Sequence, residues 1–308
     1  MRIVSLIASA TEIVHFLGLT DYLVGVSHEC DFPNDIKKLP ICSKPAFDIN
    51  GCSLDTDKTI KSLFQQALSI YSIDEKLLYK LNPDIIITQS QCNVCAVSIK
   101  DVEIALQKDI GINPKIISLN PMNLEDVWKD IYTIATNLDA EERGKDLMNL
   151  IRSDINNLKS IGEKKVGAVT VACIEWIEPL MYASNWVPDL VELAGGIDLF
   201  GTKGGHSSWS SNETLFDKNP DKIILMPCGY DIKKTINELE PLRSISNWSK
   251  LRAVRTNNVF ITDGNQFFNR PGPRLVDSLK ILIEILQDND SIFGYKGKAW
   301  VKLNDLDL

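Results

Sequence analysis

One long stretch of the chain, residues 139–160, has the spacing of an amphipathic helix. Apolar side chains recur every three or four positions along it, at Ala140, Leu147, Leu150, Ile151, Ile155 and Leu158. Asp139 followed by Glu142 predicts a capping box, which starts the helix at Asp139. A helix of this length spans roughly 33 Å, about the diameter of a small domain. The segment can therefore act as a rod between two domains.

The chain before this helix and the chain after it share one pattern. Strand-like apolar runs lie at residues 2–7, 22–27, 81–88 and 114–119 in the first half, and at 166–173, 218–225 and 258–262 in the second. The phrase Asn-Pro-Asp precedes a β-branched run once in each half. We therefore predict an α/β fold of two lobes with mostly parallel sheets, joined by a single long backbone helix, with a ligand cleft between them. The expected parts are an N-terminal lobe at 1–121, connecting helices at 122–160 that include the backbone helix, and a C-terminal lobe at 161–308.

Composition places the chain among globular proteins and narrows the class of partner. The 308 residues are 44% hydrophobic and 24% charged, enough for two cores of ordinary size and without the long apolar run that membrane insertion needs. The formal net charge of -8 argues against a nucleic-acid partner, because no basic stripe is present to neutralise phosphates. We expect a monomer whose partner is a small molecule.

The first residues bear on location. Residues 2–7 read as a core strand rather than as part of a signal peptide, and the odd set of seven cysteines fits a reducing compartment. As written, the chain is expected in the cytoplasm. If the native N-terminus was trimmed, the expectation becomes periplasmic or extracytoplasmic.

Polar groups follow the first two strand candidates. After the first, we predict a helix start at Thr11, with Thr11 or Ser9 as its cap. The free amides of such a helix end suit a polar ligand group, although capping explains the same residues equally well. After the second, His28, Glu29 and Cys30 stand in a row at an edge where open α/β sheets bind ligands.

A Cys-x-x-Cys pair, Cys92 and Cys95, follows the third strand candidate and allows four interpretations. The two residues are small buried side chains, a redox pair, half of a metal site completed by His28 or Cys30, or ligand contacts. A single Cys-x-x-Cys pair does not distinguish between these four interpretations.

The second half carries aromatic residues in polar, Pro- and Gly-containing loops. Such rings offer a large contact area at low entropic cost and suit a flat apolar ligand. The residues are Trp176, Trp186, Trp209, Tyr230, Phe267 and Phe268.

The combined pattern resembles the class III periplasmic-binding-protein-like family, which binds cobalamin, haem and iron siderophores, and within it a cobalamin-binding branch. The resemblance covers essentially the whole chain. It is carried by Ser9-Ala10-Thr11-Glu12, residues 27–33 and 91–96, Glu175-Trp176, and residues 186–196 and 270–277.

The resemblance implies a non-catalytic solute-binding protein that holds a corrinoid or related metal chelate between its lobes. The flat face of the ligand would lie against the aromatic residues, and Thr11, Gln91 and Asn185 would meet its amide arms. His28 or His206 could approach the metal. Glu213 stands where such proteins dock on an ABC permease, whereas residues 91–96 hold no matching acid in the first half. The resemblance therefore favours an uptake receptor or a cytoplasmic carrier, with no cofactor required beyond the bound cobalamin or other chelate.

Two other classes stay open on the sequence. A metal-binding protein or metalloenzyme would gather Zn or Fe at His28, Cys30, Cys92 and Cys95, with Glu29 or Glu175 as a base. A purely scaffolding protein would leave the aromatic loops without a role.

Overall fold

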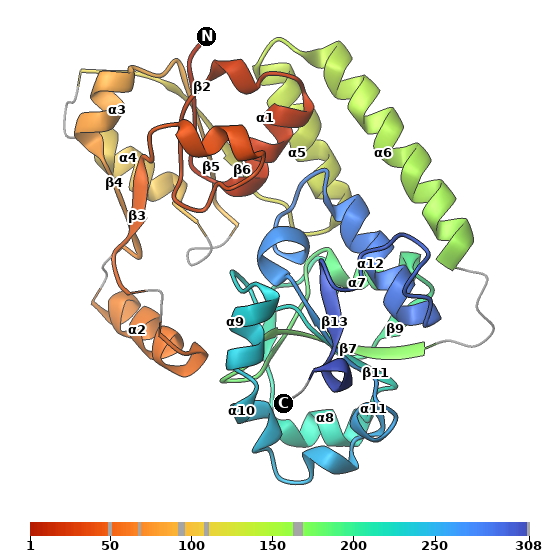
Figure 1. Ribbon diagram of the computed structural model, residues 1–308. Helices are drawn as coiled ribbons and strands as arrows, with labels where there is room; N and C mark the ends of the chain where they lie inside the picture. Colours follow the sequence, from red (N-terminus) through yellow and green to blue (C-terminus); the bar gives the residue numbers. More distant parts are fainter. Residues whose placement is uncertain (49–50, 67–68, 92–95, 108–110, 163–168, 307–308) are drawn as a thin grey trace. The chain divides into compact units, whose positions relative to one another are not determined.

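The computed structural model describes residues 1–48, 51–66, 69–91, 96–107, 111–162 and 169–306. The chain divides into two compact α/β units (Figure 1). Unit 1 comprises Met1–Gly51, Asp55–Pro121 and Glu125–Leu150. Unit 2 comprises Cys52–Leu54, Met122–Leu124 and Ile151–Leu308. The predicted class, two α/β lobes, is confirmed.

Unit 1 is built on a parallel four-stranded sheet in the order β2-β1-β5-β6. Its strands are β1 (Ile3–Ser5), β2 (Leu23–Val26), β5 (Ile85–Gln89) and β6 (Lys115–Leu119). All four match predicted runs. Their side chains are apolar on both faces because helices cover a parallel sheet from both sides, and Val4, Leu6 and Ile86 are fully buried. A separate antiparallel pair is formed by β3 (Ser43–Pro45) and β4 (Tyr71–Ile73).

The helices of unit 1 are α1 (Ala8–Phe16), most of α2 (Ser53–Gln65), α3 (Glu75–Leu81), α4 (Ile99–Gln107) and α5 (Leu124–Asn137). The prediction that the first helix starts at Thr11 was wrong. Helix α1 begins three residues earlier at Ala8, and its N-cap is Ile7, which makes no side-chain capping bond. Thr11 and Ser9 lie inside the helix, so neither is its cap.

Helix α6 (Glu141–Gly162) is the long amphipathic helix and runs unbroken from unit 1 into unit 2 (Figure 1). The predicted capping box at its start was wrong. Asp139 has a left-handed backbone, φ +54°, and ends α5 instead. The amides of Asp139 and Ala140 donate to Thr136 and Ala135, the paired bonds that close a helix C-terminus. Aspartate tolerates this conformation better than most residues, which allows it to end one helix just before the next begins.

The predicted connecting segment 122–160 does not form a part of its own. Helix α5 belongs to unit 1 from Glu125 onward, and α6 divides between the units after Leu150. The sequence pattern predicts the long helix but not the residue at which it passes from one unit to the other. The apolar spacing is the same at both ends of an amphipathic helix, so it does not mark that boundary.

Unit 2 has a mixed sheet in the order β10-β8-β7-β11-β12-β13, with β9 also paired to β7. Its parallel centre matches the predicted runs: β7 (Val169–Trp176), β11 (Lys222–Leu225) and β12 (Val259–Thr262). Strands β8 (Met181–Tyr182), β10 (Ser208–Trp209) and β13 (Trp300–Lys302) add antiparallel edges, and β9 (Gly196–Asp198) is parallel. The core of unit 2 packs against the central strands through Ile174, Ile223 and Ile261, all fully buried.

The helices of unit 2 are α7 (Val187–Leu193), α8 (Asn212–Lys218), α9 (Ile232–Asn237), α10 (Glu240–Arg243), α11 (Arg252–Arg255) and α12 (Leu275–Gln287). Helices α7 and α12 pack together, and α7 also contacts β9. A further turn, η4 (Gly264–Phe268), follows β12.

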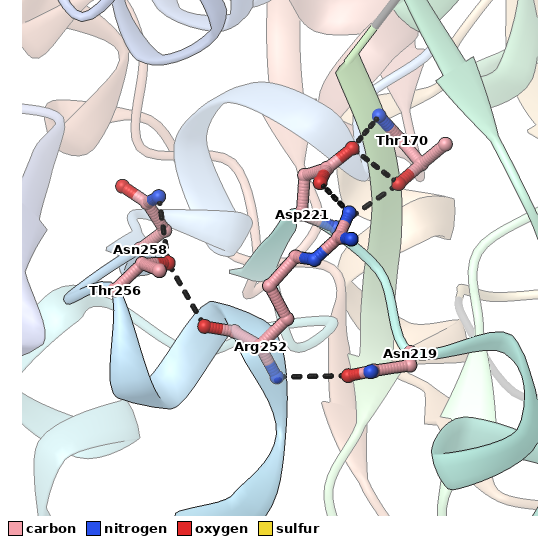
Figure 2. Close-up of polar contacts among 6 residues, drawn as sticks. All are labelled: Thr170, Asn219, Asp221, Arg252, Thr256 and Asn258. Carbon is pink, nitrogen blue, oxygen red and sulfur yellow. Dashed lines mark hydrogen bonds and ion pairs between the residues drawn. The ribbon is translucent and has the colours of Figure 1, made fainter.

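The repeated Asn-Pro-Asp phrase is a helix-to-strand turn used once in each unit. Asn82 ends α3 and Asn219 ends α8, each in the left-handed conformation. The aspartate two residues later ties the turn to a neighbouring strand: Asp84 Oδ2 accepts from the Arg2 amide at 2.7 Å, before β1. Asp221 Oδ2 accepts from the amide and the hydroxyl of Thr170 on β7, at 2.9 and 2.7 Å (Figure 2). The repeat is therefore a structural device, and it fixes where β5 and β11 begin.

Candidate functional site

Polar side chains of unit 1 gather past the carboxyl ends of β1 and β2. Thr11 Oγ1 donates to Ser5 Oγ at 2.8 Å and lies 3.1 Å from Cys30 Sγ. Cys30 Sγ also lies 3.2 Å from Ser27 Oγ. All four residues are buried, so the contacts join the first turn of α1 to the loop after β2. The structure thus shows Thr11 engaged inside unit 1, and its predicted ligand contact stays a prediction.

His28 stands on the same loop and is held from one side. Its Nδ1 lies 2.9 Å from Ser43 Oγ, and its ring lies 5.3 Å from that of Tyr71. Burial lowers the pKa of His28 below its ordinary value of 6.5, so the ring is neutral at pH 7. Its Nε2 is buried without a hydrogen bond and lies 3.7 Å from Glu29 Oε1. A neutral imidazole whose Nε2 makes no hydrogen bond is chemically able to ligate a metal or to hydrogen-bond a polar group.

The predicted metal cluster is not assembled in the part of the chain that the structure describes. Within those residues, no group of three or more His, Cys, Asp or Glu is placed to hold a metal ion. Cys92 and Cys95 lie outside the described residues. The proposed Zn or Fe site therefore stays a prediction that rests on His28 and Cys30 alone. Gln91, the other predicted contact here, is partly buried just past β5.

In unit 2, loops from three neighbouring strands join into one surface at their carboxyl ends. The amide of Cys228, after β11, donates to the carbonyl of Glu175 on β7 at 3.1 Å. The amide of Asn265, after β12, donates to the carbonyl of Tyr230 at 3.0 Å. We call the ends of β7, β11 and β12 with these loops the carboxyl-end surface of unit 2.

Trp176 and Tyr230 lie together on this surface. Their rings are 5.4 Å apart and tilted, and the Trp176 indole donates to the carbonyl of Glu178 at 3.1 Å. The Lys234 ammonium lies 4.1 Å above the Tyr230 ring. Trp176 is partly buried and Tyr230 fully so. The pair is thus fixed in place before any ligand arrives.

Three of the other predicted aromatic contacts are buried. Trp186 is 6% exposed, and its indole donates to the carbonyl of Phe268 at 2.8 Å. Phe267 is 8% exposed and Phe268 has no exposed surface. These rings support the fold of unit 2 in this conformation, and their predicted contact with a ligand is untested.

Of the remaining predicted contacts, His206 lies on the loop between β9 and β10, Asn185 pairs with that loop, and Trp209 and Glu213 follow it. The backbone of Asn185 pairs with it at both atoms, donating to Gly205 at 2.9 Å and accepting from Gly204 at 3.1 Å. His206 is exposed, and Trp209 on β10 is 50% exposed. Glu213 is exposed at the start of α8, as docking on a partner would require.

The partly buried carboxylate of Glu175 fastens this loop, and sequence reasoning missed this role. Ser207 Oγ donates to Glu175 Oε2 at 2.5 Å and accepts from the Ser184 amide at 3.2 Å. Burial raises the pKa of Glu175 to about 6, although the bond from Ser207 acts in the opposite direction. Sequence analysis named Glu175 only as a candidate base and as part of a matching segment, since nothing in the sequence pairs it with Ser207.

The family is settled by comparison with known proteins. A sequence profile described as periplasmic binding protein matches residues 3–265 of the 308. The chain belongs to the periplasmic binding protein family. The predicted class III resemblance is thereby confirmed. As a periplasmic binding protein the chain is a binding protein and not an enzyme. The family match therefore does not support the metalloenzyme alternative.

Individual relatives of this periplasmic binding protein are distant but match over most of their length. An uncharacterized ABC transporter substrate-binding lipoprotein, YvrC of Bacillus subtilis (strain 168), is 24% identical over 291 residues, which cover 92% of this chain and 79% of the relative. A vitamin B12-binding protein of Pectobacterium carotovorum is 22% identical over 278 residues, covering 89% and 84%.

The fold of this periplasmic binding protein is also that of solved relatives. The periplasmic heme-binding protein RhuT from Roseiflexus superposes with a TM-score of 0.70 at 20% identity, covering 94% of this chain and 98% of that one. YvrC is named a lipoprotein and RhuT is named periplasmic, so neither name supports the predicted cytoplasmic location. Among the described residues, every helix is too short or too polar to cross a membrane.

Proposed function

We propose that this protein is the substrate-binding component of an ABC uptake system, working outside the cytoplasm, and that it binds a corrinoid or a related metal chelate such as haem. The names of the relatives support this class of ligand: one binds vitamin B12, one binds haem, and one is an ABC transporter lipoprotein. Both chelates contain a flat macrocycle several rings wide. The proposal therefore needs a fixed aromatic surface.

The observation that carries the proposal is that the Trp176 side chain is held in one orientation on the carboxyl-end surface of unit 2. A bond to Glu178 at its indole nitrogen and the Tyr230 ring beside it hold the side chain from two sides. Because the ring is already ordered, little entropy is lost when a macrocycle packs on it. Trp209 adds a half-exposed ring at the end of the loop that Ser207 fastens to Glu175.

Titration with candidate chelates tests the proposal. Purified protein is titrated with cyanocobalamin, dicyanocobinamide and haemin while tryptophan fluorescence is followed. We expect saturable quenching at one chelate per chain by at least one of them. Trp176→Ala should weaken binding of that chelate by about 1 to 3 kcal/mol, as for an aromatic anchor.

A matched control separates ligand contact from loss of an aromatic residue as such. Tyr79 is 61% exposed on α3, before the amino end of β5 and away from the carboxyl ends of the strands. Tyr79→Ala should leave affinity unchanged, whereas Trp209→Ala should lower it. Equal effects from Tyr79→Ala and Trp176→Ala, or no saturable binding of any chelate, would reject the proposal.

The transport partner is proposed to be an ABC permease that contacts Glu213. This carboxylate is exposed in the first turn of α8, where it is free of the ligand contacts proposed above. Glu213→Lys should reduce chelate uptake by cells that express the transporter and leave the dissociation constant of the purified protein unchanged. A parallel fall in affinity would place Glu213 in the binding site instead.

A further inference from the structure

Helix α2 begins in unit 2 and continues in unit 1. It spans Ser53–Gln65, but Cys52–Leu54 belong to unit 2 and Asp55–Pro121 to unit 1. Two later side chains of the helix, Ile60 and Leu63, pack against the core of unit 1. The rest of unit 2 lies more than sixty positions further along the chain. The first turn of α2 is therefore held in unit 2 by contacts and not by its neighbours in the sequence.

The printed contact at this end is a cap supplied by a distant carboxylate. The Ser53 amide donates to Glu238 Oε2 at 2.9 Å, across 185 positions of sequence. Glu238 follows directly after α9. The first amides of a helix have no partner within the helix, and the positive end of its dipole lies there, so a carboxylate stabilises this end. Glu238 thus attaches the start of α2 to unit 2.

This attachment has a low stability. Among the described residues, Ser53 Oγ and Thr56 Oγ1 are buried without a hydrogen bond. Unsatisfied buried hydroxyls destabilise the arrangement that buries them. The apolar side chain of this turn, Leu54, is only half-buried. An element with few buried apolar contacts opens at a low cost in free energy. The first turn of α2 can therefore leave unit 2 while the core of unit 2 stays folded.

The carboxylate that caps α2 also acts on the aromatic pair of the carboxyl-end surface. Lys234 lies on α9, four positions before Glu238, and its ammonium lies 4.1 Å above the Tyr230 ring. Burial lowers the pKa of Lys234, whereas the charges of Glu238 and Asp231 act in the opposite direction. Tyr230 in turn lies 5.4 Å from Trp176. A short series of contacts therefore runs from the start of α2 to the proposed ligand surface.

Glu238 has two alternative partners, which gives this series two arrangements. With α2 attached, the carboxylate accepts from the Ser53 amide, and the Lys234 ammonium stays over Tyr230. With α2 detached, an ion pair with Lys234, four positions away, replaces the lost bond and draws the ammonium from the ring. A ligand packed on Trp176 favours the first arrangement, because the ring pair is then held as observed.

We infer that the first turn of α2, residues 53–56, is a strap that attaches to unit 2 through Glu238, and that its attachment and chelate binding strengthen each other through Lys234. The inference rests on the proposed function and goes beyond it, because α2 lies outside the aromatic contacts assigned to the ligand. Two sites that bias one two-state element are coupled reciprocally. The ligand strengthens the attachment by the same factor as the attachment strengthens ligand binding.

Hydrogen exchange of the Ser53 amide, followed by NMR, measures the attachment. The first amides of a helix lack a partner within it, so protection of this amide reports its bond to Glu238. The probe is whichever of cyanocobalamin, dicyanocobinamide and haemin saturates the protein. We expect the saturating chelate to slow this exchange about tenfold, as for a bond to a charged group. Glu238→Ala should remove the protection with and without chelate.

Two substitutions of Ser53 form a matched pair for the affinity measurement. Proline is tolerated at the first position of a helix, so Ser53→Pro removes the amide donor and leaves α2 able to form. Ser53→Ala keeps the donor and removes only the unbonded hydroxyl. Ser53→Pro should weaken chelate binding about tenfold, matching the factor found by exchange, whereas Ser53→Ala should leave it unchanged.

Two further variants test the route through α9. Glu238→Ala should weaken chelate binding as much as Ser53→Pro does, and the two changes combined should weaken it no further, because both break one bond. Lys234→Met should keep the Ser53 amide protected and remove its response to the chelate. If Ser53→Pro lowers the melting temperature, Glu238→Ala and wild-type exchange carry the test.

The outcomes separate the inference from the proposed function. If a chelate binds but does not slow exchange of the Ser53 amide, the inference is wrong and the proposed function stands. The same holds if Ser53→Pro and Ser53→Ala bind the chelate alike, or if the response persists in Lys234→Met. Failure of all three chelates to bind the unmodified protein rejects the proposed function, and the inference with it.

Discussion

Removing the carboxylate of Asp221 should destabilise unit 2 far more than the same change at Asp84 destabilises unit 1. Both residues end an Asn-Pro-Asp turn, yet their contacts differ. Asp221 accepts two bonds from Thr170 and pairs with the Arg252 guanidinium at 2.5 Å, and its side chain is 30% exposed (Figure 2). Asp84 accepts a bond from the Arg2 amide and lies 3.8 Å from the Met1 ammonium, and its side chain is 59% exposed.

The size of the difference follows from these contacts. A hydrogen bond to a charged group contributes about 1.5 to 3 kcal/mol when it is buried, and exposed ion pairs contribute about 0 to 1 kcal/mol. Asp221→Ala leaves the Thr170 amide without its partner at the start of β7. We therefore expect Asp221→Ala to lower the free energy of unfolding by about 2 to 3 kcal/mol, and Asp84→Ala by about 0.5 to 1 kcal/mol, after discounting for exposure.

Urea unfolding followed by circular dichroism measures both values, and pH adds a second readout. Burial acts to raise the pKa of Asp221, but the bonds from Thr170 and the pairing with Arg252 outweigh it and hold the pKa below its ordinary value of 3.8. A lowered pKa gives stability that is present above 3.8 and is lost as the pH falls through the folded-state pKa. The gap between wild type and Asp221→Ala should therefore shrink in strong acid.

Equal losses at the two sites would refute this reasoning, because the two turns share the Asn-Pro-Asp phrase and differ in these contacts and in exposure. A loss at Asp221 that does not change in strong acid would show that the charge is not what stabilises the turn.

Three further substitutions test other parts of the structure. Trp186→Ala should lower the free energy of unfolding by about 3 to 5 kcal/mol in a denaturation assay, because the ring is buried and bonded to Phe268; a loss under about 1 kcal/mol would show that the ring is not part of the core. The folded-state pKa of Glu175 is raised to about 6 from 4.5. In thermal melts, wild type should therefore lose stability relative to Glu175→Gln as the pH rises between these values. A stability difference that stays constant with pH would contradict the raised pKa. Asp139→Ser should lower the free energy of unfolding by about 1 kcal/mol, whereas Asp139→Asn should leave it nearly unchanged, because the residue has a left-handed backbone. An unchanged free energy of unfolding in Asp139→Ser would instead support the predicted capping role.

The central strands were predictable because a parallel sheet covered on both faces leaves unbroken apolar runs in the sequence. Strands β1, β5, β11 and β12 are such runs, and the Asn-Pro-Asp turns mark where two of them begin. Strands β8 and β10 escaped prediction because each has two residues, too few to show a period.

The aromatic loops show where local composition misleads. Trp186 has polar and Pro neighbours, as an exposed ring would, yet it is buried because its partner, the Phe268 carbonyl, lies 82 positions away in the chain. Exposure of a loop residue depends on such distant contacts, which a local pattern does not contain. Trp209 carries a similar local signal and is half exposed.

Capping residues were misread for a related reason. Ser9 and Asp139 are residue types that cap helices, and the sequence places both close to helix ends. The backbone decides the outcome: Asp139 closes the helix before it, and Ser9 lies within a helix that starts earlier. Capping of α1 by Ser9, one of the two predicted caps, would have satisfied its hydroxyl, whereas the observed helix start leaves it unbonded.

The proposal that the protein holds one flat metal chelate without transforming it is tested most directly by equilibrium dialysis against cyanocobalamin and haemin, followed by recovery of the ligand. We predict saturation at about one chelate per chain with a dissociation constant in the micromolar range or below, and return of the ligand with its absorption spectrum unchanged. Absence of saturable binding to both chelates, or recovery of a chemically altered ligand, would contradict the account.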